Sequence, residues 1–124
     1  MVNSSYINDK LKEFLEKFEE KVGEIDEIIS VGIDVQGKVR TLRSVKYTGS
    51  GDILSDPDVR KYLKKGGYIV GIEFIGNWRG CKFRFKIGYS DKFSYMRVSR
   101  GRNSLELTKE ALSKLKTIYL DVYG

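Results

Sequence analysis

Residues 81–89 show the most regular pattern in the chain, an alternation of apolar and polar side chains. The odd positions are all apolar and three of the even positions are basic: Cys81, Phe83, Phe85, Ile87 and Tyr89 against Lys82, Arg84 and Lys86. Successive side chains of a β-strand point to opposite faces, so the pattern predicts a strand with one buried and one solvated face. Such strands are typical of an antiparallel sheet that is covered on one side only.

Weaker patterns on both sides of this strand predict a small α+β domain. Alternation also indicates strands over residues 29–35, 39–47, 68–76 and 93–100. Apolar residues at helical spacing indicate helices over residues 6–22, 57–65 and 108–120. The order α-β-β-α-β-β-β-α predicts a five-stranded antiparallel sheet with the long terminal helices packed on one face. With 124 residues, we expect one domain over positions 1–124.

The turn between the first two strands decides which of their residues share a face. The odd positions Val39, Thr41 and Arg43 lie on the same face as Val35 only if the loop after Val35 has an odd length. We therefore expect a three-residue turn at Gln36, which would give both strands a common apolar face.

A tight turn around residues 90–91 pairs the alternating strand with the strand that follows it. On the core side, the expected register pairs apolar residues, Phe83 with Val98 and Phe85 with Met96. On the other side it pairs cations with a cation or a tyrosine, Arg84 with Arg97 and Lys86 with Tyr95. Like charges directly opposite each other destabilise a sheet, so this face requires counter-charges or an anionic ligand.

The charge distribution favours an anionic partner for the basic part of the chain. Residues 1–35 hold nine acidic residues and four lysines, a net charge of −5, whereas the remainder holds 19 basic and eight acidic residues, a net charge of +11. Cations bind phosphate and aromatic rings stack on unpaired bases, so we expect binding of DNA or RNA. The expected nucleic-acid-binding residues are Lys82, Arg84, Lys86, Phe93, Tyr95, Arg97, Arg100 and Arg102.

A second interpretation of the same charges needs no ligand. In it, the acidic first helix or Glu73 neutralises the basic sheet within the molecule, and Glu73 pairs with a cation across the sheet. Glutamine occurs once and methionine twice, a depletion that resembles the composition of hyperthermophile proteins.

Several classes of function are disfavoured by residues that the chain lacks. It has no histidine, which removes His-dependent acid–base and triad chemistry and nearly every zinc site, so we expect neither an enzyme, a metal nor a cofactor. The loop 48–52 is glycine-rich but lacks the spacing of a phosphate-binding loop. Its single cysteine suits a reducing, cytoplasmic compartment, and no apolar run approaches the length of a membrane span.

Residues 27–39, EIISVGIDVQGKV, resemble the first hairpin of a roadblock domain, and the order of elements is similar to that of roadblock and longin-type regulatory domains. The resemblance implies a small dimerising module associated with GTPase regulation and trafficking. The second expected helix is shorter than in that family, and the basic sheet is unusual for it. The alternative function is therefore a homodimeric protein-interaction module, which a fold resemblance alone does not establish.

Overall fold

A computed structural model describes residues 4–43, 45, 52–89, 94–99 and 105–124 of the chain. In chain order the elements are α1 (Ser4–Lys21), β1 (Ile25–Val35), β2 (Lys38–Arg43), the 3-10 helix η1 (Asp52–Ser55), α2 (Pro57–Leu63), β3 (Tyr68–Trp78), β4 (Cys81–Tyr89), β5 (Ser94–Ser99) and α3 (Leu105–Tyr123). The expected α+β class and the expected order of α-helices and strands are confirmed. Within the described ranges, no helix is both long enough and apolar enough to cross a membrane.

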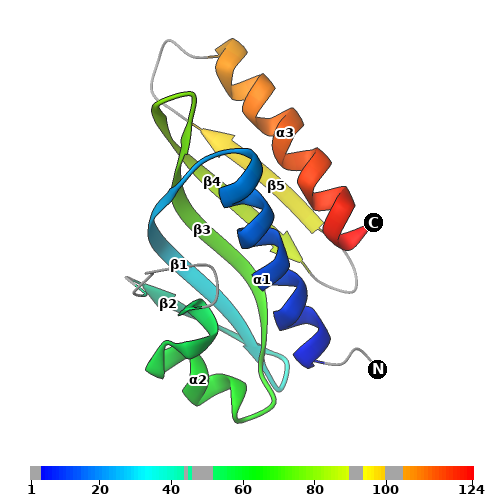
Figure 1. Ribbon diagram of the computed structural model, residues 1–124. Helices are drawn as coiled ribbons and strands as arrows, with labels where there is room; N and C mark the ends of the chain where they lie inside the picture. Colours follow the sequence, from blue (N-terminus) through cyan, green and yellow to red (C-terminus); the bar gives the residue numbers. More distant parts are fainter. Residues whose placement is uncertain (1–3, 44, 46–51, 90–93, 100–104) are drawn as a thin grey trace.

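The strands form one antiparallel sheet in the order β2-β1-β3-β4-β5. Helices α1 and α3 lie side by side across one face of this sheet, and α2 lies at the end where β1 turns into β2 (Figure 1). Where α1 and α3 meet, Lys21 pairs with Asp121 at 3.4 Å and the rings of Phe14 and Tyr123 are 6.5 Å apart. The opposite face of the sheet, called the open face below, is covered by none of these helices.

An aromatic cluster joins α1 to the middle of the sheet. The ring of Phe18 meets Phe74 and Phe85 edge-on, with centroids 4.9 and 4.8 Å away, and the latter two rings stack at 5.4 Å. All three side chains are fully buried, as are Leu115 and Ile118 of α3. Edge-to-face and offset arrangements of this kind add to the stabilisation from burial, so the core fixes both long helices on the same side.

The turn between β1 and β2 has two residues, so the three-residue turn expected from the sequence is wrong. Gln36 and Gly37 have φ angles of 52° and 83°, and Val35 pairs directly with Lys38. Positive φ at both central positions is the signature of a type I′ turn, whose twist matches that of the flanking strands. The turn geometry therefore overrides the apolar pattern: Val39 is 59% exposed on the open face, and Arg40 shares the face of Val35.

The register between β4 and β5 also differs from the expected one. Phe85 pairs with Val98 and Lys86 with Arg97, a shift of two residues that ends the ladder at Tyr89 and Ser94. A shift of two residues leaves every side chain on its original face, so alternation alone cannot distinguish the two registers. The expected turn at residues 90–91 lies outside the described residues.

Candidate nucleic-acid interface

The open face carries three of the expected site residues on a single strand. Lys82, Arg84 and Lys86 of β4 point away from the buried side, and their side chains are 72%, 57% and 40% exposed. Their alternation with buried Phe83 and Phe85 places them on this face. The strand thus presents a row of cations to solvent at every second position.

The remaining expected site residues are placed only in part. The backbone register puts Arg97 opposite Lys86 and Tyr95 opposite Gly88, so both positions belong to the open face, although their side chains are outside the described part. Phe93, Arg100 and Arg102 lie outside the described residues. The expected pairs Arg84–Arg97 and Lys86–Tyr95 are wrong, because the register is shifted by two residues.

Two carboxylates on the open face partly neutralise the cations of β4. Glu73 lies 3.6 Å from Nε of Arg84 and 3.9 Å from Nζ of Lys86, which confirms the expected cross-strand pairing. The carboxylate of Asp26 lies 3.2 Å from Nζ of Lys82 and accepts a 2.9 Å hydrogen bond from the side-chain amide of Asn77. The side chains of Glu73 and Asp26 are only 17% and 29% exposed, whereas the cations are the exposed members of these pairs and keep surface that a further anion can reach.

A groove of about 340 Å³ crosses the open face beside these cations. Gly32 of β1 is paired with Gly71 of β3, and because neither has a side chain, the floor of the groove at this point is backbone. Arg43 of β2 stands on one side of the groove and Glu73 and Lys86 on the other. Arg43 was missed as a site residue because the expected three-residue turn placed it on the core face. A two-residue turn assigned from Gln36-Gly37 would have placed it on the open face.

Trp78 and Cys81, which flank the turn between β3 and β4, both pack against the core. The guanidinium of Arg79 lies over the ring of Trp78, 5.0 Å from the centroid, while forming an ion pair with Glu110 at 2.6 Å. Cys81 is a half-buried free thiol. Within the described residues, no group of three His, Cys, Asp or Glu side chains is arranged to hold a metal ion.

No protein-family model matches the chain, and comparisons with curated proteins and with solved structures likewise give no match. The likeness of residues 27–39 to a roadblock hairpin therefore remains a resemblance.

Proposed function

We propose that the protein binds DNA or RNA without catalysing a reaction and that the open face of the sheet is the binding surface. The observation that carries this proposal is the row of exposed cations on β4, Lys82, Arg84 and Lys86, on a sheet face that the helices leave uncovered. Cations held on a strand lie about 6.6 Å apart at alternate positions, close to the spacing of successive phosphates in an extended strand.

The bases of the nucleic acid find room in the groove beside these cations. A floor of glycine backbone lets a planar ring approach the sheet closely, and Arg43 supplies a further cation on the far side. In this proposal Arg97, Arg100 and Arg102 extend the phosphate contacts, and Phe93 and Tyr95 stack on unpaired bases. Phosphate would replace Glu73 and Asp26 as the partner of these cations and release counterions from the nucleic acid, so binding should weaken as the salt concentration rises.

Fluorescence anisotropy of labelled single-stranded DNA, RNA and duplex, titrated at several salt concentrations, tests the proposal. We expect binding in low salt, with log K falling linearly with log salt. The double variant Lys82→Gln/Arg84→Gln should bind more weakly and reduce the slope by about two. A matched control, Lys109→Gln/Lys116→Gln, removes the same charge from exposed positions of α3. Equal weakening by both pairs, or no binding of the unaltered protein, would overturn the proposal.

A homodimeric protein-interaction module is the second candidate, because the same uncovered face also exposes Val39 to 59%. Val39 lies on β2, an edge strand of the sheet, and an exposed edge strand can pair with a strand of a second copy. Analytical ultracentrifugation over a range of concentrations distinguishes the two. A concentration-dependent dimer that binds no nucleic acid favours the module, and a monomer that binds nucleic acid rejects it.

A further inference from the structure

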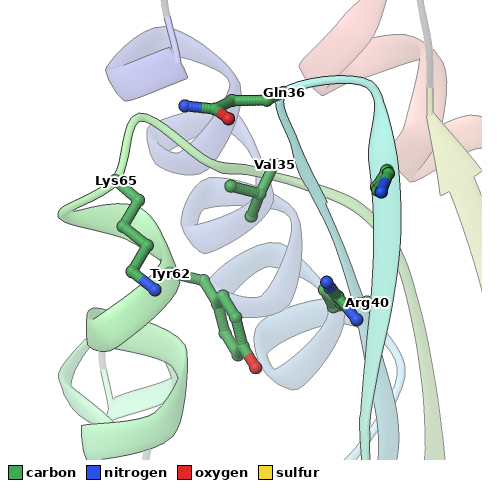
Figure 2. A pocket seen from close by; sticks show the side chains of 6 residues that line it. Val35, Gln36, Arg40, Tyr62 and Lys65 are labelled. Carbon is green, nitrogen blue, oxygen red and sulfur yellow. The ribbon is translucent and has the colours of Figure 1, made fainter.

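A second cavity lies on the opposite side of the sheet, between α2 and the turn that joins β1 to β2. It has a volume of about 470 Å³, within the range of small-ligand pockets. Figure 2 shows Tyr62 of α2 and Lys65, just after the end of that helix, on one side, Arg40 of β2 on the other, Val35 between them and Gln36 at the rim. Lys38, next to the turn, completes the lining.

The two-residue turn creates this cavity by bringing basic residues to the face of Val35. Because Val35 pairs with Lys38 across the turn, Lys38 and Arg40 point toward α2 and not toward the open face. With the three-residue turn expected from the sequence, Val39 and Thr41 would occupy this side instead. The cluster is therefore independent of the cations on β4.

Helix α2, on the opposite wall of the cavity, is capped at its start and attached to the core by a buried side chain. The carboxylate of Asp56 caps the helix by accepting hydrogen bonds from the backbone N–H groups of Asp58 and Val59, at 2.9 and 3.2 Å. Val59 is fully buried in the core. After the helix, Gly67 passes so close to β1 that a Cβ there would lie 3.0 Å from the side chain of Val35.

The lining of the cavity has three cations and no carboxylate. Among the described side chains, none of the ion pairs involves Lys38, Arg40 or Lys65. Nζ of Lys65 lies 5.8 Å from the centre of the Tyr62 ring, where the ring face attracts a cation. Like charges gathered around one space repel each other, and an anion placed between them removes that repulsion.

We propose that this cavity binds a small molecule that carries a diphosphate group. Three cations match the roughly three negative charges that a diphosphate carries near neutral pH, and the guanidinium of Arg40 offers a planar fork that can bind two phosphate oxygens at once. The hydroxyl of Tyr62 and the amide of Gln36 supply neutral hydrogen-bond donors. Val35 presents an apolar surface to the rest of the ligand. This inference goes beyond nucleic-acid binding and shares no residue with it.

Titrations followed by NMR of the backbone amides test the proposal with four probes: inorganic pyrophosphate, ADP, AMP and adenosine. We expect pyrophosphate and ADP to shift the amides of residues 36–40 and 62–65 saturably, AMP to bind about tenfold more weakly, and adenosine to leave them unchanged. Tighter binding of ADP than of pyrophosphate would identify a nucleotide as the source of the diphosphate, and equal binding would identify the diphosphate group alone.

The variant Lys38→Gln/Lys65→Gln should weaken pyrophosphate binding about tenfold or more. Arg60→Gln/Lys64→Gln is the matched control, because it removes the same charge from exposed positions in and next to α2 that do not line the cavity. Lys82→Gln/Arg84→Gln should leave pyrophosphate binding unchanged, which separates this site from the open face. The proposal fails if pyrophosphate causes no saturable shift, if the shifts map to β4, or if the control pair weakens binding equally.

Discussion

Phe18 packs directly on the backbone of Gly76, so that a Cβ at position 76 would lie 2.7 Å from Cζ of the ring. The same Cβ would lie 3.2 Å from Cε2 of Phe85. Real Cβ atoms essentially never lie closer than 3.0 Å to another heavy atom, so the position of the Phe18 ring requires a glycine at this position of β3.

Replacement of Gly76 by alanine should therefore lower the free energy of unfolding by about 1–3 kcal/mol, because a close-packed core responds poorly to an added methyl group. Urea denaturation followed by circular dichroism measures the change. Gly32→Ala is the matched control: its Cβ would have only ordinary contacts, the nearest at 3.7 Å. We expect this control to be neutral or slightly stabilising, and an equal loss in both variants would contradict the explanation.

Asn8 provides a buried hydrogen bond where the pairing of β1 with β3 is irregular. Its side-chain oxygen accepts a 3.1 Å hydrogen bond from the backbone N–H of Ile69, next to a register shift between Gly32 and Ile33. Asn8→Ala should cost about 1–3 kcal/mol, because the N–H of Ile69 would stay buried without this acceptor. Hydrogen exchange of the Ile69 amide should become faster. Thr117→Ala, which removes an exposed hydrogen bond on α3, should have almost no effect.

Glu73 is the internal counter-charge of the proposed nucleic-acid surface. If phosphate competes with it for Arg84 and Lys86, Glu73→Gln should tighten binding of nucleic acid by roughly threefold, because it removes the internal partner of these two cations. Glu16→Gln changes the net charge equally, at an exposed position of α1 on the other side of the sheet. Anisotropy titrations at one salt concentration compare the two. Identical gains would mean that net charge, and not this surface, controls binding.

Gln36 adopts a left-handed backbone conformation that its side chain does not favour. Asparagine tolerates positive φ better, and Asn-Gly is the preferred pair in type I′ turns, so Gln36→Asn should stabilise the protein by about 0.5 kcal/mol. Gln36→Val should instead destabilise it, because a β-branched residue is strained at positive φ. Thermal denaturation of both variants measures the difference in Tm. A higher Tm for Gln36→Asn together with a lower Tm for Gln36→Val is expected only if Gln36 has a positive φ in a two-residue turn.

The strand at residues 81–89 shows how much of the fold can be predicted from the sequence. Its alternation correctly placed Phe83, Phe85 and Ile87 in the core and Lys82, Arg84 and Lys86 on the open face, because the period of a strand is a local property. The pairing of Glu73 with a cation could be predicted because Glu73 and the cations of β4 lie on the same face of the sheet. The α+β class followed from the order of strand and helix patterns.

The strand register and the turn geometry could not be predicted from the alternation of apolar and polar residues. A shift of two residues between β4 and β5 preserves every face, so Val98 satisfies the apolar pattern opposite either Phe83 or Phe85. At Gln36 the expectation that Val39 shares the face of Val35 favoured the wrong turn, since the edge strand gains little from burying Val39. The cavity beside α2 depends on that turn and was therefore missed.

The single tryptophan, Trp78, ends β3 at the opposite end of that strand from Tyr68, whose backbone pairs with Asp34 beside the α2 cavity. Its indole is packed against the core with a guanidinium over the ring. Because Trp78 is the single tryptophan, its fluorescence can be excited selectively and reports the loss of native packing when the protein unfolds. A ligand bound beside α2 would leave the emission of the native state unchanged, so stability can be measured in its presence without an attached dye.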